Sequence, residues 1–326
     1  MRNVVYACDN HYVRQTIVSV VSLLENNKYP IKVWIVSDGI KMENIELIIE
    51  KTRKFHIELE FLDIEKILED VILVGGERHP RTIYAKLFLE DAIRADKLLY
   101  LDSDTVINCD LSELWIRDMS EELIAGVMMP YSAIKKGLMD ISSKASYLCD
   151  GIVLLNLDLW REYKISNKCK EYIQRYMGKP PMMSEGTLNY ICQQKIGVLP
   201  PRYNLMSFMI MYSSKKIGKL FETKDYYTEL ELDEARNFPA IIHFIKELYN
   251  RPWFDPCDHP YKTMYREKYE SLFPNGEYEF NPLENHTRFT RLLFHILPFG
   301  VYTFLYHLKE RVVRNYDKKS IYKRLP

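Results

Sequence analysis

The feature of this sequence that most constrains its fold is an alternation of short apolar segments with longer amphipathic ones. Strands are predicted for the short segments, which are rich in β-branched residues: 3–9, 31–39, 57–63 and 97–104. Helices are predicted for the amphipathic segments, which repeat apolar residues at helical spacing: 13–24, 41–51 and 83–93. Strands that alternate with such helices form parallel βαβ units, so we expect an α/β protein with a doubly wound, mostly parallel sheet and helices on both of its faces.

The second half of the chain continues this pattern less regularly. A buried strand is predicted within residues 150–160, a helix over 185–195, and a strand over 238–244 that ends on His243. The 326 residues are enough for one large domain with an appendage.

Acidic residues stand where three of the first four predicted strands end: Asp9, Asp38, and the pair Asp102 and Asp104. Ligands of doubly wound folds bind beyond the carboxyl ends of the strands. Because strand residues two apart point the same way, Asp102 and Asp104 can converge on one cation, and carboxylates suit Mg²⁺ or Mn²⁺. A His added from the later strand would bias the site toward Mn²⁺. The alternative is a solvated turn, since a chain of this composition contains about one such pair by chance.

Charge and cysteine content exclude some classes of protein. The net charge is zero, which argues against a general nucleic-acid binder. The six cysteines form no C-x-x-C pair, so a thiolate zinc site is not predicted, and reduced thiols are the expectation. The first residues have no signal-peptide pattern, because their apolar run is short and meets Asp9 at once, so we expect a cytoplasmic protein.

Seven short motifs occur in an order that resembles a known family. They are VVYACDNHYV, YAKLFLEDAI, LLYLDSDTVI, GIVLLNLDLWR, EGTLNYI, PPRYNLM and HFIKELYNRPW. Over roughly residues 1–270 the chain resembles glycosyltransferase family 8, the retaining GT-A group that includes bacterial lipopolysaccharide galactosyl- and glucosyltransferases and glycogenin. The resemblance implies a Rossmann-like GT-A fold. It also implies transfer of a hexose, glucose or galactose, from a UDP-sugar to a lipid-linked or cell-surface glycan such as lipopolysaccharide or capsule.

The resemblance also implies roles for individual residues. Asp102, Asp104 and His243 match the ligands of a Mn²⁺, with Mg²⁺ as the alternative, that holds the UDP diphosphate. The positions that match donor-binding residues are Ala7, Asp9, Tyr12, Lys86, Ser103, Asp150 and Arg251. Among them Ala7 and Asp9 cradle uridine, Tyr12 stacks on the uracil, and the alternative for Asp9 is a cap of the following helix.

Three positions depart from the family pattern. Lys86 replaces an Arg and Arg251 replaces a Lys, and both are candidate helpers as UDP departs. Glu185 replaces a Gln that lies near the β-face of the sugar's anomeric carbon. We therefore hypothesise that Glu185 is a catalytic residue, with Lys86 as the second. The alternative for Glu185 is a helix N-terminal residue that follows Ser184 as the cap.

The C-terminal segment differs from the rest of the chain. Residues 285–326 carry nine Lys or Arg and two acids, a net charge of +7, so residues 1–284 carry −7. Its 17-residue run from Leu292 to Leu308 has no charged residue, but it is short and broken for a membrane span. We expect a catalytic domain over 1–275 and a basic, aromatic tail over 276–326 that attaches to the inner face of the cell membrane. The alternative is a pair of helices that packs back on the catalytic domain.

Two rival functions remain open at this point. A sugar nucleotidyltransferase would share the sheet and the metal carboxylates, but it would have a Gly-rich loop near the N-terminus that this chain lacks. A catalytically weak sugar-nucleotide-binding protein is the other rival, because the loop after His243 is two residues longer than in the family and lacks its Gly.

Overall fold

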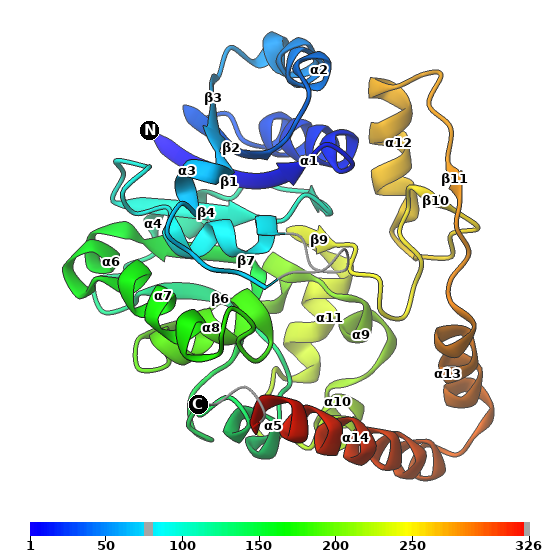
Figure 1. Ribbon diagram of the computed structural model, residues 1–326. Helices are drawn as coiled ribbons and strands as arrows, with labels where there is room; N and C mark the ends of the chain where they lie inside the picture. The colour runs from blue at the N-terminus through cyan, green and yellow to red at the C-terminus, as the bar shows by residue number, and fades with distance from the viewer. Residues whose placement is uncertain (75–80, 323–326) are drawn as a thin grey trace.

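A computed structural model of the chain describes residues 1–74 and 81–322, and its centre is a seven-stranded sheet (Figure 1). The strands lie in the order β3-β2-β1-β4-β7-β6-β8. Their bounds are β1 (Arg2–Asp9), β2 (Ile31–Asp38), β3 (Glu58–Asp63), β4 (Lys97–Leu101), β6 (Ile124–Met128), β7 (Leu148–Asn156) and β8 (Ile196–Val198). Strand β7 runs antiparallel to β4 and β6, while the other pairs are parallel. The predicted mostly parallel sheet is confirmed.

The register of the first strands brings the acidic strand ends together. Strands β1 and β2 pair in parallel as far as Asp9 opposite Asp38. Strand β4 pairs with the other side of β1 in the same direction, so Asp102, which directly follows β4, belongs to the same edge of the sheet. The expected gathering of acids at the carboxyl edge is therefore present.

Helices cover both faces of the sheet, as the strand pattern predicts. Alternate residues of β1 point to opposite sides, so Val4 packs into one apolar core with Ile17 of α1, and Val5 packs into a second core with Leu87. The helices of the first three-quarters of the chain are α1 (Val13–Asn26), α2 (Met42–Thr52), η1 (Arg53–Phe55), α3 (Ile64–Ile67), η2 (Arg81–Phe88), α4 (Ser112–Ile116), α5 (Ala133–Gly137), α6 (Leu157–Tyr163), α7 (Ile165–Arg175), α8 (Met183–Cys192), η3 (Pro201–Asn204), α9 (Ser207–Met211), α10 (Ser214–Leu220) and α11 (Glu229–Asn237).

The helix predicted over 83–93 is wrong in type and extent. The segment is a 3₁₀-helix, η2, that ends at Phe88 and is followed by turns. Its residues 84–87 are all buried, because η2 contacts β1, β2, α7 and α8. A segment packed on several sides has no single apolar stripe, so the periodicity that suggested an amphipathic α-helix was misleading.

A small second sheet delivers the predicted histidine to the sheet edge. Strand β5 (Thr105–Ile107) follows the carboxylate pair and pairs antiparallel with β9 (Ile241–His243). The register places Thr105 opposite His243. Residues about 140 positions apart in the chain are thereby brought into one turn region.

The C-terminal quarter wraps around one side of the molecule (Figure 1). Its elements are β10 (Phe254–Asp255), α12 (Lys262–Leu272), β11 (Glu279–Phe280), α13 (Asn285–Ile296) and α14 (Phe299–Tyr322). Among the described residues, no helix combines the length and the apolar character that crossing a membrane requires. The predicted division into 1–275 and 276–326 stays a prediction.

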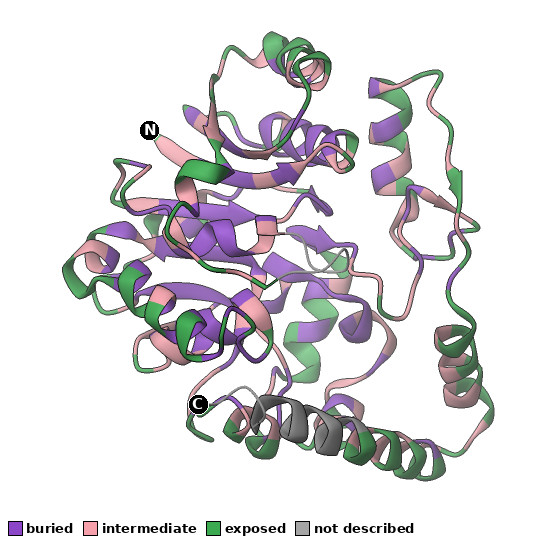
Figure 2. Ribbon diagram, in the orientation of Figure 1, coloured by how far each residue is buried: buried purple, intermediate pink, exposed green. Residues whose placement is uncertain are grey.

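The last two helices pack against the body through one side only. Tyr302 of α14 shares a hydrogen bond of 3.0 Å with the hydroxyl of Tyr212, and His307 lies 3.1 Å from the carbonyl oxygen of Leu220. The outward side of α13 and of the described part of α14 is exposed (Figure 2). One face of this helix pair therefore packs back on the catalytic domain, as the alternative expected. The other face is exposed.

Candidate active site

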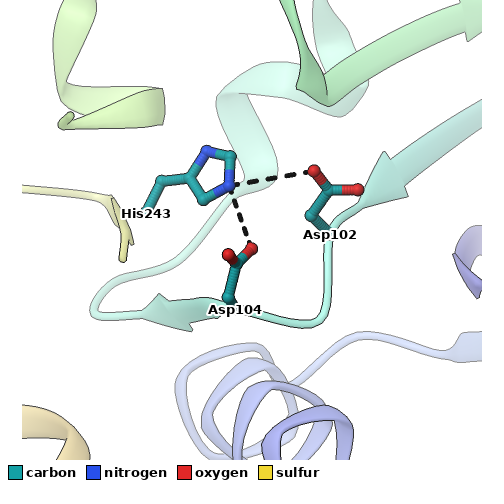
Figure 3. Close-up of side chains that lie close together, drawn as sticks. All are labelled: Asp102, Asp104 and His243. Atoms are coloured by element: carbon teal, nitrogen blue, oxygen red, sulfur yellow. Dashed lines mark hydrogen bonds and ion pairs between the residues drawn. The ribbon is translucent and has the colours of Figure 1, made fainter. Parts of the chain in front are cut away.

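Two carboxylates and one imidazole form a compact cluster at the carboxyl edge of the sheet. Asp102 directly follows β4, Asp104 directly precedes β5, and His243 ends β9 (Figure 3). Nε2 of His243 lies 3.0 Å from Oδ1 of Asp104 and 3.8 Å from Oδ2 of Asp102. One ligand atom from each residue lies within 4.8 Å of the other two. The three predicted metal ligands are thus brought together.

The orientation of His243 is set by a buried asparagine. Nδ1 of the imidazole donates to Oδ1 of Asn204 at 3.0 Å, which leaves Nε2 to face the two carboxylates. Burial opposes a charge on the imidazole, but Asp104 outweighs it and raises the pKa of His243 well above its usual value. A metal-binding histidine commonly donates its other ring N–H to such an oxygen, and this hydrogen bond fixes the tautomer.

A glycine keeps open the space beside this cluster. A Cβ added to Gly151 would lie 2.6 Å from Oδ2 of Asp102 and would overlap the ring of His243. The backbone N–H of Asp102 donates to the carbonyl oxygen of Gly151 at 2.7 Å, so the close approach is fixed by a hydrogen bond. Two carboxylates with one imidazole are a donor set that suits a divalent cation such as Mn²⁺ or Mg²⁺, and the residues therefore fit such an ion.

A buried lysine compensates the acids on one side of the cluster. Nζ of Lys86 donates to the carbonyl oxygen of Asp150 at 2.8 Å, and it lies 3.1 Å from Oδ2 of Asp150 and 3.7 Å from Oδ1 of Asp102. Burial disfavours the ammonium, but Asp102 and Asp150 outweigh it, and the pKa of Lys86 is raised. Burial raises the pKa of Asp102, and Lys86 opposes that rise. Lys86 therefore carries its charge into the site.

Arg251 supplies a second positive charge from the loop after β9. Nη2 donates to Oδ2 of Asp104 at 3.2 Å, and Nη1 donates to the hydroxyl of Tyr12 at 2.7 Å. Burial opposes ionisation of Asp104, but His243 and Arg251 outweigh it, and the pKa of Asp104 is lowered below its ordinary range. The longer loop after His243 thus still places its arginine against the carboxylate pair.

The predicted uridine-side residues lie where β1 meets α1. Oδ1 of Asp9 accepts from the backbone N–H groups of His11 and Tyr12, at 2.9 and 3.0 Å, in the turn before the helix. The hydroxyl of Ser103 accepts from Thr16 at 2.8 Å and donates to the carbonyl oxygen of Ala7 at 3.4 Å. The alternative for Asp9, a cap of the following helix, is wrong, because Tyr12 occupies the cap position without a side-chain bond and Oδ1 of Asp9 instead closes the turn before it. The role of Asp9 and Ala7 toward uracil stays a prediction.

Glu185 lies in the first turn of α8 and is held by tyrosines. Its Oε1 accepts from the hydroxyl of Tyr147 at 2.9 Å and of Tyr131 at 3.4 Å, and the two rings are 4.5 Å apart. Burial, followed by the charge of Asp150, raises the pKa of Glu185 to about 8. The suggested cap role of Ser184 is wrong. Residue 182 occupies the cap position without a side-chain bond, and the Ser184 hydroxyl instead donates to Oδ2 of Asp150 at 2.7 Å.

The structure adds residues to which sequence reasoning gave no role. They are Tyr131, Tyr147, Gly151, Ser184 and Asn204, of which Ser184 had been considered only as a cap. Gly151 and Asn204 stand inside the motifs GIVLLNLDLWR and PPRYNLM, so a signal for both was present without a reason for it. Nothing in the sequence connects the two tyrosines with Glu185, because their hydrogen bonds to it depend on how β6, β7 and α8 pack.

Comparison with known proteins supplies a family and a fold. The family model described as Glycosyl transferase family 8 matches residues 3–257. General stress protein A of Bacillus subtilis is 26% identical over 270 residues, which are 81% of this chain and 91% of that protein. Lipopolysaccharide 1,2-glucosyltransferase of Escherichia coli is 26% identical over 279 residues, 82% of this chain and 77% of that protein.

A solved structure shares the architecture. The galactosyltransferase LgtC, crystallised with donor and acceptor sugar analogues, superposes with a TM-score of 0.67 and 19% identity, over 88% of this chain and 99% of that one. At this identity the likeness establishes the fold, which is the GT-A arrangement that the motifs implied.

Proposed function

The chain belongs to glycosyltransferase family 8, and from this premise we propose that it is a metal-dependent, retaining transferase that moves a hexose from a UDP-sugar to a lipid-linked or cell-surface glycan. Membership makes it a glycosyltransferase enzyme. The observation that carries the finer proposal is the cluster of Asp102, Asp104 and His243 beside Gly151. Glucose or galactose is the proposed hexose, because the relatives include a lipopolysaccharide glucosyltransferase and a structure of a galactosyltransferase.

The proposed cation is Mn²⁺, with Mg²⁺ as the alternative, held by Asp102, Asp104 and His243. When bound, such an ion neutralises the charge of the UDP diphosphate as it leaves. Asn204 holds His243 in the tautomer that offers Nε2, and Gly151 keeps side-chain atoms out of the space beside it. The preference for Mn²⁺ rests on the imidazole in the donor set.

The two cationic side chains would bind and orient the donor. Arg251 comes from a loop and hydrogen-bonds to both Asp104 and Tyr12, and these contacts support a role for its guanidinium beside the diphosphate. Lys86 is buried and charged between Asp102 and Asp150, where Ser184 also donates to Asp150. We assign uridine recognition to Ala7, Asp9, Tyr12 and Ser103, and donor-sugar contact to Asp150.

Retention of configuration calls for a group that stabilises the anomeric carbon. We assign this role to Glu185, whose Oε1 is fixed by two tyrosine hydroxyls. A carboxylate held there would stabilise an oxocarbenium-like centre, or would attack it and be displaced by the acceptor. The acceptor hydroxyl would enter on the face that UDP leaves, so the product keeps the anomeric configuration of the donor.

We further propose that the C-terminal helices attach the enzyme to the inner face of the cell membrane. The exposed apolar residues of α14 fall on one stripe at helical spacing: Val301, Phe304, Leu305, Leu308 and Val312. Exposed apolar residues of α13 add to this surface: Phe289, Leu292 and Ile296. Lysines and arginines of the same segment would pair with anionic lipid.

The transferase proposal is tested by UDP release from a panel of UDP-sugars, with Mn²⁺ and then with EDTA. We expect slow hydrolysis of one UDP-sugar, lost with EDTA and reduced at least 100-fold in Asp104→Ala. Asp70→Asn, at an exposed aspartate that pairs with Lys170, is the control. Nuclear magnetic resonance of the glycoside product should show the anomeric configuration of the donor. Metal-dependent UDP-sugar binding without turnover would favour the weak binding protein instead.

The membrane proposal is tested by flotation of the full chain with phosphatidylglycerol vesicles. The double variant Phe304→Glu with Leu308→Glu should remain unbound, while Phe238→Glu, an exposed phenylalanine on another surface, should float like the wild type. Equal flotation of both variants would contradict the assignment to α14.

A further inference from the structure

A cavity of about 270 Å³ separates the C-terminal helices from the body of the enzyme. Its lining comes from four places: the segment after β6, the region of α9 and α10, the loop after β9, and helices α13 and α14. Residues 258–322, which include both helices, lie beyond the family match at 3–257. One wall of this cavity is therefore a feature of this chain and not of the family model.

One side chain connects this cavity to the candidate active site. Tyr131 lines the cavity, and its hydroxyl donates to Oε1 of Glu185 at 3.4 Å. The ring of Tyr131 also packs on Tyr147, the second tyrosine that holds Glu185. A molecule in the cavity would therefore lie one side chain away from the residue that we assign to the anomeric carbon.

The loop after β9 contributes an acid to the same cavity. Glu247 stands four residues after His243, in a loop that is two residues longer than in the family. Its side chain lines the cavity, where burial raises the pKa of the carboxyl and the positive charges of His243 and Lys135 oppose that rise. The Glu247 carboxyl can therefore hydrogen-bond to a molecule in the cavity.

Helix α14 presents a different face to the cavity from the one it presents to solvent. Tyr302, Tyr306 and Lys309 line the cavity, and they alternate along the helix with the exposed apolar stripe. The wall is anchored by the hydrogen bond between Tyr302 and Tyr212 and by the edge-to-face contact of Tyr306 with Phe221 at 5.9 Å. The cavity face of α14 is therefore an ordered aromatic surface.

The chemistry of the lining is that of a carbohydrate site. Aromatic rings offer flat apolar faces to the C–H groups of a sugar, and Glu247, Lys135 and Thr290 offer acceptors and donors for its hydroxyls. Both signs of charge are present, so the lining does not select an anion or a cation. A smaller adjoining cavity shares Tyr131 and Tyr306 with this one and continues to Glu310, which extends the site along α14.

From these observations we propose that the cavity under α13 and α14 binds the acceptor, a neutral glycan of more than one sugar, and that the C-terminal helices complete this site. The inference rests on the proposed transferase function and adds the place and class of the acceptor to it. With the apolar stripe of α14 on a membrane, the neighbouring face of the same helix would hold a glycan whose lipid end lies in that membrane.

The test uses the full-length enzyme with Mn²⁺ and the UDP-sugar that it hydrolyses. Octyl β-glucoside, octyl β-galactoside and octyl β-lactoside are added below their micelle concentrations, and UDP release is measured with and without each glycoside. The variants are Tyr306→Ala and Glu247→Gln, with Phe280→Ala and Glu171→Gln as exposed controls of matched type. Tyr306→Phe keeps the ring and serves as the conservative variant.

We expect at least one glycoside, most strongly the disaccharide, to accelerate UDP release from the wild type. Its KM should rise about tenfold in Tyr306→Ala and in Glu247→Gln, return toward the wild-type value in Tyr306→Phe, and stay at that value in both controls. Wild-type KM values in both cavity variants would overturn the inference. So would acceleration by none of the glycosides, or equal acceleration by octanol, while donor hydrolysis persists. Absence of metal-dependent UDP release from the wild type would instead overturn the proposed function on which the inference rests.

Discussion

Asp104 and Glu185 are two carboxyl groups of one candidate active site whose surroundings shift their pKa values in opposite directions. Burial opposes ionisation of both. At Asp104 the imidazole of His243 and the guanidinium of Arg251 outweigh burial, so its pKa is lowered. At Glu185 burial is reinforced by the negative charge of Asp150, and the hydroxyl of Tyr147 only partly offsets them, so its pKa rises to about 8.

The opposite pKa shifts suit the two acids to different tasks within one fold. A carboxylate that must bind a cation is kept ionised by positive neighbours, whereas a buried carboxyl beside another acid keeps its proton near neutral pH. The groups that set the pKa values of Asp104 and Glu185 come from different strands and loops.

Gly151→Ala should disrupt the cluster of metal ligands while leaving Glu185 in place. The added Cβ would lie 2.6 Å from Oδ2 of Asp102, so the carboxylate and His243 must move apart. We expect Mn²⁺-dependent UDP release to fall at least 100-fold, because displacement of a catalytic group by about 1 Å costs that much. Gly137→Ala, where an added Cβ meets nothing within 4 Å, is the matched control. Near-full activity of Gly151→Ala would show that the cluster does not hold the ion.

Glu185→Gln should abolish the pH dependence that ionisation of Glu185 gives to the transfer rate. If ionised Glu185 is the active form, the wild-type transfer rate rises with pH through about 8, since the carboxyl loses its proton there. The amide cannot ionise, so the variant should be about 100-fold slower at high pH and show no such rise. Measured pH–rate profiles decide this, and a variant that retains nearly full transfer would remove Glu185 from the mechanism.

The Glu185 carboxyl should also make the free energy of unfolding depend on pH. Because the folded pKa of Glu185 lies above its ordinary value, the native state holds a proton that the unfolded state releases between the ordinary value and about 8. The free energy of unfolding of the wild type should therefore fall relative to that of Glu185→Gln as the pH rises through this window. Urea unfolding at pH 5 and pH 9 would measure the difference, and parallel curves would contradict the raised pKa.

Tyr147→Phe should have the smallest effect and act only through Glu185. The hydroxyl of Tyr147 donates to Oε1 and lowers the pKa of Glu185, so its removal should raise that pKa further. We expect the midpoint of the pH–rate profile to move upward and the rate at high pH to fall only a few-fold. Tyr163→Phe, a partly exposed tyrosine of α6, is the control. A downward shift of the midpoint would mean that Tyr147 does not stabilise the carboxylate.

Much of the fold was predictable because it depends on local patterns. Strands and helices in the first hundred residues follow from apolar periodicity, and the acids at the strand ends follow from parallel pairing. The residues of the metal cluster, Asp102, Asp104 and His243, were also predictable, since their motifs occur in the order of the family. The convergence of His243 with the two aspartates could be inferred only through that resemblance, because residue 243 is far away in the chain.

Some predictions failed because tertiary contacts outweighed a local sequence preference. The segment 83–93 has helical periodicity, but packing on several sides made it a shorter 3₁₀-helix that buries Lys86. Ser184 stands where a cap is expected, but the Ser184 hydroxyl donates to the Asp150 carboxylate on strand β7 instead. Each local preference is worth about 1 kcal/mol, which a tertiary contact can exceed.

The sequence by itself determined the α/β architecture, the edge at which the site lies and the residue types that can hold a cation, because these depend on periodicity and on residue chemistry. Tertiary structure alone decided which groups surround each acid. Asn204 and Arg251 reach the metal cluster, Tyr131 and Tyr147 reach Glu185, and α14 forms one wall of the adjoining cavity. These neighbours set the pKa values and the shape of the site through desolvation and short-range contact, and neither can be read from spacing along the chain.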